Sequence, residues 1–144
     1  MTLDALHDEW TKDHDLDLSQ LDKAIRQVPF LHGKWWKYYT TERQTYAVVR
    51  QERDKLRHDK FEWYVGRLSE EDRIARGWPP QPLRIVRQDV ERFLSGDAEL
   101  IPYESRIEMQ EIKLKLIEDV IKSLNNRGYL IKTSVDYLRF SNGQ

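Results

Sequence analysis

Cationic and aromatic side chains are concentrated in eleven residues near the middle of the chain, from Arg57 to Arg67. Cations can contact the phosphates of a nucleic acid, and aromatic rings can stack on unpaired bases, each stack contributing about 1–3 kcal/mol. The combination is typical of sites that bind single strands with little sequence preference. The side chains concerned are Arg57, His58, Lys60, Phe61, Trp63, Tyr64 and Arg67.

Helical spacing distributes these side chains over more than one face. Lys60 would share a face with Arg57 and with Tyr64. Trp63 instead continues an apolar stripe, and Phe61 points elsewhere. A structural interpretation is therefore open as well, in which the aromatic rings belong to a core and the cations face solvent. On this segment alone, the structural interpretation is the stronger one.

Residues suited to catalysis or metal binding show no comparable grouping. The sequence has no glycine-rich phosphate loop, no nucleophile elbow and no cysteine. None of its four histidines lies four residues from another, as a helical metal site would prefer. Acidic side chains occur in mixed-charge runs, which are typical of solvated helix faces. We expect no catalytic residue, no metal and no cofactor, and a small nuclease or hydrolase is the weakest interpretation.

Charge is distributed unevenly over the 144 residues, although the net charge is only −1. Residues 1–33 carry three basic and seven acidic side chains, residues 34–92 fourteen and ten, and residues 93–144 seven and eight. The basic excess thus coincides with the segment that could bind a nucleic acid. Ordinary scatter over a charge-rich surface is the alternative. No apolar run would suit a signal peptide or a membrane span, so we expect a cytoplasmic protein.

Apolar periodicity in the first two thirds of the chain predicts a mainly α-helical fold. Leu3, Leu6 and Trp10 mark a first helix. A short second helix is expected over 18–28, where Pro29 should end or redirect it. One long central helix is expected to begin close to Gly33 and to end at Gly66. Residues 68–83, rich in glycine and proline, predict a loop, and residues 83–94 a short helix.

A second long helix is predicted near the C-terminus, from Pro102 to about Asn126, with Gly128 as its terminator and an extended segment over 129–133. It carries two apolar stripes, so it needs two packing partners. One partner could be another subunit, or both stripes could pack inside one chain. We expect a DNA-binding lobe at 1–94 and an oligomerisation lobe at 95–144, or a single compact domain. The stripe expected to serve oligomerisation consists of Ile107, Leu114, Ile117, Ile121 and Leu124, and the other of Ile112, Leu116 and Val120.

Five short motifs, taken in order, make the sequence resemble a known family over nearly its whole length. They are Leu6 with Trp10-Thr11-Lys12-Asp13, then Lys34-Trp35, Trp63-Tyr64-Val65-Gly66-Arg67, Arg127-Gly128-Tyr129-Leu130-Ile131-Lys132, and Phe140 with Gly143. Each motif is weak alone, whereas their order and spacing are fairly specific. The chain is similar to the UvsY family, the recombination mediators of T-even-type bacteriophages.

The resemblance implies a mediator without catalytic turnover, acting in the cytoplasm of an infected bacterial host. Such proteins load a RecA-like phage recombinase onto single-stranded DNA that is coated by a phage single-strand-binding protein. They work as ring-like homo-oligomers, hexamers or heptamers. A helical oligomeric adaptor without DNA binding of its own is the alternative.

The resemblance also indicates where DNA would bind. Two basic residues of the family fall here on His58 and Lys60. His58 is a departure, because an imidazole is largely neutral at pH 7, and Arg57 beside it can supply the missing charge. The 68–83 loop is longer than is usual in the family. The expected DNA contacts are Arg57, His58, Lys60, Tyr64 and Arg67, with Lys34, Lys37 and Arg43 as further candidates.

Overall fold

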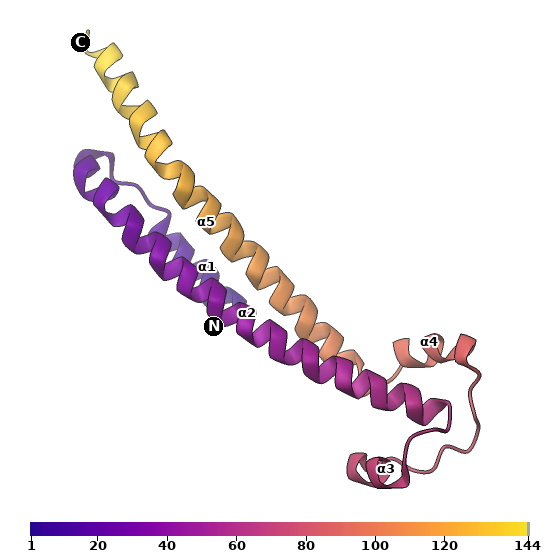
Figure 1. Cartoon of the computed structure of the whole chain (residues 1–144). Coiled ribbons are helices and arrows are strands. Elements are labelled where there is room, and N and C mark those ends of the chain that lie inside the picture. The colour runs from indigo at the N-terminus through magenta and orange to yellow at the C-terminus, as the bar shows by residue number, and fades with distance from the viewer. Residues whose placement is uncertain (144) are drawn as a thin grey trace. The chain divides into compact units, whose positions relative to one another are not determined.

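The computed structural model describes residues 1–143 and contains only helices, turns and loops over that range (Figure 1). The mainly α fold class is therefore confirmed for the described part of the chain. The elements are α1 (Leu3–Asp13), the 3-10 turn η1 (Leu18–Gln20), α2 (Leu21–Tyr64), α3 (Glu70–Arg76), α4 (Arg87–Ser95) and α5 (Ile101–Ser141).

The central helix is longer than its sequence indicates, because α2 continues through Pro29. The expectation that Pro29 ends a helix over 18–28, and that a new helix begins near Gly33, is wrong. Proline removes one helical hydrogen bond, the one to the carbonyl four residues earlier. That turn carries the exposed side chains of Ile25 and Phe30, the latter 80% exposed. Water can therefore reach the carbonyl that lacks a helical partner.

The expected end of the central helix is confirmed at its C-terminus. Gly66 has a φ of +77°, in the left-handed region that glycine adopts without strain. The N–H groups of Arg67 and Leu68 donate to the carbonyl of Glu62 at 2.8 and 3.1 Å. Both bonds go to one carbonyl group near the end of the helix, which would otherwise lack a partner.

The segment 68–83 is not a continuous loop, because it contains α3. Ser69 caps this helix, accepting a hydrogen bond from the N–H of Asp72 at 3.1 Å. Acidic residues in the first turn and basic residues in the last turn complement the helix dipole. The helix has only seven residues, too few for apolar periodicity to reveal it. The next helix, α4, begins at Arg87 and not at residue 83.

The C-terminal helix begins with Pro102 in its first turn, as predicted, but it does not end at Gly128. The expected extended segment over 129–133 is also wrong, because α5 continues to Ser141. Packing beyond the glycine explains the continuation, since Ile131 is buried. Arg127 further fixes this stretch by donating to the carbonyls of Asp13 and His14 at 2.9 and 3.0 Å.

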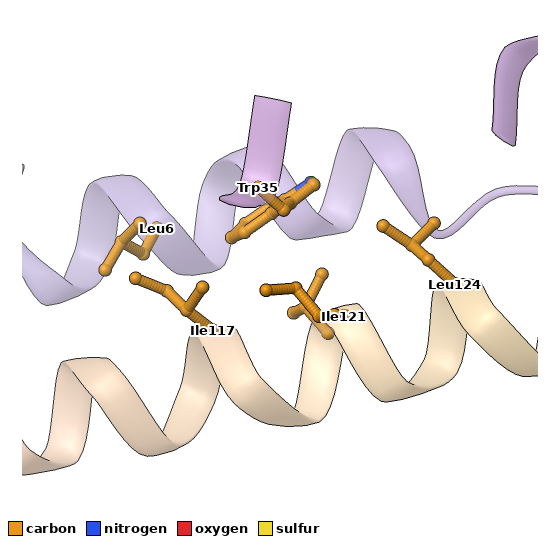
Figure 2. Close-up of a cluster of buried hydrophobic side chains, with 6 residues drawn as sticks. Leu6, Trp35, Ile117, Ile121 and Leu124 are labelled. Atoms are coloured by element: carbon orange, nitrogen blue, oxygen red, sulfur yellow. The ribbon is translucent and has the colours of Figure 1, made fainter. Parts of the chain in front are cut away.

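The chain forms two compact units that interleave along the sequence. The first comprises Met1–Gln44 together with the chain from Gln110 onward, and the second comprises Thr45–Met109. The expected lobes, 1–94 and 95–144, are by contrast contiguous, and the roles assigned to them remain predictions. In the first unit, apolar side chains from α1, α2 and α5 meet in one cluster, centred on Trp35 (Figure 2). The second unit has its own core, formed by Leu56, Trp78, Val90, Leu94 and Leu100.

Candidate nucleic-acid interface

The last three turns of α2, in the second unit, carry four of the five principal residues expected to contact DNA, Arg57, His58, Lys60 and Tyr64. Leu56 and Lys60 face inward on this helix, both buried. His58 is exposed, and Arg57 is partly exposed. One helix therefore divides the cations of the segment between the core and solvent.

Lys60 is held inside the second unit. It is only 6% exposed, and its Nζ atom lies 3.2 Å from Asp97 Oδ2 and 3.2 Å from Glu99 Oε1. The same ammonium group lies 4.4 Å from the centroid of the Trp78 ring and 5.1 Å from that of Trp63. Two carboxylates and two aromatic faces thus satisfy this charge. A DNA contact through Lys60 would require these interactions to open.

Tyr64 belongs to the same internal network. Its hydroxyl donates a 2.7 Å hydrogen bond to Asp97 Oδ2, and the N–H of Glu99 donates to Asp97 Oδ1 at 2.9 Å. Burial, followed by the bond to Asp97, raises the pKa of the Tyr64 phenol far above its ordinary value. Burial raises the pKa of Asp97 as well, but its bonds from Tyr64, Glu99 and Lys60 together lower that pKa below its ordinary value. A neutral phenol and a charged carboxylate are therefore the stable pair.

Arg57 and His58 lie on the outer side of this region. Together with Asp54, Phe61 and Leu94 they line an open hollow of about 350 Å³. The Arg57 side chain is 38% exposed and forms an ion pair with Glu91, which is more exposed still. This hollow offers a guanidinium and an imidazole beside an aromatic ring. Such a set can contact a phosphate and a base together.

Arg67 follows α2, beyond Gly66. Its side chain is 50% exposed, with its Nε atom 3.4 Å from a carboxylate oxygen of Glu62. An exposed pair of this kind contributes little stability and can be exchanged for another anion.

The three further candidates Lys34, Lys37 and Arg43 belong to the first unit, whereas 57–67 belongs to the second. Lys34 is paired with Glu9 and Asp13, at 2.7 Å each. Burial lowers the pKa of its ammonium group, but the bonds to Asp13 and Glu9 raise that pKa more, so the group is held charged. Lys37 and Arg43 are exposed.

The apolar stripe expected to serve oligomerisation is buried within the single chain. This holds for all five of its members, Ile107, Leu114, Ile117, Ile121 and Leu124. The other stripe is mixed, because Ile112 is 45% exposed whereas Val120 is only 3% exposed. Packing inside one chain is thus enough to account for the burial of the first stripe. A role for either stripe between subunits remains a prediction.

Sequence reasoning missed the partners of Lys60, which are Trp78, Asp97 and Glu99. The indole N–H of Trp78 donates to Glu99 Oε1 at 2.9 Å and completes the network around Lys60. Glu99 is 39 residues from Lys60, so no local spacing reveals the pair. Within residues 1–143, no group of three histidine, aspartate or glutamate side chains could hold a metal ion. None of the helices described is long and apolar enough to cross a membrane.

Comparisons with known proteins agree on the family. The family model described as "Recombination, repair and ssDNA binding protein UvsY" matches residues 9–144. A crystal structure of the bacteriophage T4 recombination mediator protein UvsY superposes with a TM-score of 0.82 at 18% identity, covering 99% of this chain and 98% of that one. A second crystal form of that protein gives a TM-score of 0.81 at 18% identity, with 98% and 99% covered. No match was found among curated protein sequences.

At such low identity the structural likeness establishes the fold, and the family model carries the assignment further. It spans all but the first eight residues, and so includes both units and the whole segment from Arg57 to Arg67. The chain belongs to the UvsY family of recombination, repair and single-stranded-DNA-binding proteins.

Proposed function

We propose that this protein binds single-stranded DNA and acts as a recombination mediator, loading a RecA-like phage recombinase onto DNA coated with a single-strand-binding protein. Membership of the UvsY family over residues 9–144 is the observation that carries the proposal. The partners are then single-stranded DNA, the recombinase and the single-strand-binding protein, in the cytoplasm of an infected bacterial host. The protein has no catalytic turnover of its own.

Arg57, His58 and Arg67, three accessible basic side chains of the second unit, are the proposed phosphate contacts. Exchanging an exposed ion pair such as Arg57–Glu91 for a phosphate costs little, because such pairs contribute about 0–1 kcal/mol. Removing Lys60 from the buried carboxylate of Asp97 costs several kcal/mol. Lys60 and Tyr64 therefore support the surface from inside in this proposal. Direct contact by either of them is the alternative, and it requires the network around Asp97 to open.

A ring-like homo-oligomer, a hexamer or heptamer, would explain how a chain of net charge −1 holds a polyanion. Each subunit offers only a few cations, but sites repeated around a ring bind one strand with a high effective concentration. The adaptor alternative predicts the same assembly with no affinity for DNA.

The test is a fluorescence anisotropy titration of a labelled single-stranded oligonucleotide over a range of salt concentrations. We compare the wild type with Arg57→Gln/Arg67→Gln and with a matched control, Arg26→Gln/Arg139→Gln, which removes two exposed arginines from the first unit. The slope of log affinity against log salt should become shallower by about 0.7 for each phosphate that the variant no longer neutralises. The control should bind as the wild type does.

Wild-type protein that ignores single strands even at low salt would exclude the proposal and favour the adaptor. Recombinase loading is measured separately, as the amount of recombinase on an oligonucleotide already coated with single-strand-binding protein. Addition of the wild type should raise that amount. DNA binding without this rise would restrict the function to binding alone.

A further inference from the structure

The segment between α3 and α4, from Gly77 to Val86, is fixed against the end of α2. The N–H of Ile85 donates to the carbonyl of Tyr64 at 3.0 Å, and the indole N–H of Trp63 donates to the carbonyl of Pro79 at 2.9 Å. Trp78 is buried in the core of the second unit. The segment is therefore an ordered arm, held at several points along its length.

Its sequence favours a stiff backbone that carries positive charge. Three of the four residues from 79 to 82 are prolines, and each proline fixes one backbone angle. No acidic residue occurs from 77 to 88, whereas Arg84 and Arg87 both fall in that stretch. Both arginines are exposed, and neither has an ion-pair partner among residues 1–143. Two unneutralised guanidinium groups thus stand close together in sequence, Arg84 on the arm and Arg87 at the first residue of α4.

The arm places Arg84 directly against the end of α2. A Cβ atom built on Gly66 would lie 3.0 Å from Arg84 Cγ and 3.1 Å from its Nε atom, so the arginine side chain crosses the glycine backbone. Arg67 is the next residue, and its partner Glu62 is the one carboxylate paired with this group in the described chain. Arginines brought together in this way raise the local positive potential and favour an anion.

We propose that Arg67, Arg84 and Arg87 form a phosphate-binding site for single-stranded DNA, with the proline-rich arm as its scaffold. The inference rests on the proposed function and adds a second contact region to it. A guanidinium group can donate two parallel hydrogen bonds to one phosphate, so neighbouring arginines suit a sugar–phosphate backbone. Because the arm is already ordered, less conformational entropy is lost when its arginine binds a phosphate. The same chemistry would attract an acidic protein segment, which the experiment distinguishes.

The test compares Arg84→Gln/Arg87→Gln with Arg26→Gln/Arg139→Gln, which removes the same total charge from exposed positions in the other unit. Binding of a labelled single-stranded oligonucleotide is measured by anisotropy between 50 and 200 mM salt. With two fewer phosphates neutralised, the slope of log affinity against log salt should become shallower by about 1.4. The ratio of wild-type affinity to variant affinity should therefore fall about sevenfold as the salt concentration rises over this range. Arg84→Lys/Arg87→Lys, which keeps the charges, should retain most of the slope.

Circular dichroism establishes that each variant keeps its helices. If the wild type binds no single-stranded DNA, the proposed function itself fails. If the wild type binds and Arg84→Gln/Arg87→Gln behaves as the charge-matched control, only the arm is excluded as a contact. A variant that binds DNA normally but no longer retains the recombinase or the single-strand-binding protein would assign the arm to a protein partner and overturn the inference.

Discussion

The Nζ atom of Lys60 lies 4.4 Å from the centroid of the Trp78 ring. This contact joins the last part of α2 to the start of the proline-rich arm, and both residues also bind Glu99. A cation over an aromatic face in a site shielded from water contributes about 2 kcal/mol or more. Through its contact with Trp78, Lys60 thus holds the arm that carries Arg84 against α2, the helix that carries Arg57.

Replacing Lys60 by methionine should destabilise the second unit. The variant keeps an unbranched side chain, one atom shorter, but leaves the buried carboxylate of Asp97 without its cation. Removing one partner of a buried ion pair costs about 3–5 kcal/mol of stability. We expect a loss at the lower end of this range, because Asp97 keeps its hydrogen bonds from Tyr64 and Glu99. Urea denaturation measures the free energy of unfolding.

Lys55→Met is the control for this experiment, because Lys55 is exposed on the same helix. Its effect should stay within about 0.5 kcal/mol. A Lys60→Met variant that is as stable as the wild type, yet binds single-stranded DNA with a shallower salt slope, would instead make Lys60 a direct contact.

Acid should weaken the same network through Asp97. Burial raises the pKa of Asp97, but the bonds from Tyr64, Glu99 and Lys60 bring it below the ordinary value of 3.8. The unfolded chain therefore binds the proton more readily, so this stabilisation is present above about pH 4 and disappears as the pH falls through the folded pKa. We expect the free energy of unfolding to decrease below pH 4.

Asp97→Asn should make the acid limb of that curve shallower, although it lowers the stability at pH 7. Glu42 contributes to the limb in the same direction, because its pKa is also lowered overall: the bonds from Gln110 and the chain's amino group outweigh burial. Asp97→Asn should therefore flatten the curve only in part, and Glu42→Gln should flatten it further. Parallel curves for Asp97→Asn and the wild type between pH 3 and 7 would exclude the assignment.

The ends of the helices could be predicted from the sequence where neighbouring residues determine them. They could not be predicted where contacts with distant residues determine them. Gly66 ends α2 because a left-handed residue is needed there, which the sequence indicates. Gly128 carries the same local signal, yet α5 continues through it. The contacts that keep it helical come from elsewhere, including carbonyl groups of Asp13 and His14 more than 110 residues away.

For the candidate site, residue types were predictable and exposure was not. The spacing of Lys60 and Tyr64 correctly indicates neighbours on one face, because both contact Asp97, whereas Arg57 lies on the outer side. It does not indicate that Asp97 and Glu99 lie against Lys60, because that depends on the path of the chain through α3 and α4. The position of Arg84 was unpredictable for the same reason, since it reaches Gly66 only through the folded arm.

Alanine at Gly66 should destabilise the protein by about 1–2 kcal/mol, because a residue with a Cβ is strained in the left-handed region. The added methyl group would also meet the Arg84 side chain at 3.0 Å. Gly33→Ala is the matched control, since Gly33 lies within α2 and a Cβ there meets nothing within 4 Å. That variant should gain about 0.5–1 kcal/mol in helix stability. Thermal unfolding followed by circular dichroism should separate the two variants by opposite shifts of Tm.

Alanine at Pro29 should stabilise the protein. Pro29 lies inside α2, where it cannot donate to the carbonyl of Ile25 and where a helix-interior proline costs about 3 kcal/mol relative to alanine. We expect a gain of about 1–3 kcal/mol in urea denaturation. Pro102→Ala is the control, because Pro102 occupies the first turn of α5, where an N–H has no helical acceptor, and its effect should be small. A decrease in the stability of Pro29→Ala would mean that the first unit needs the proline ring, or a bend of the helix, at this position. The missing helical hydrogen bond would then be the consequence of a packing requirement.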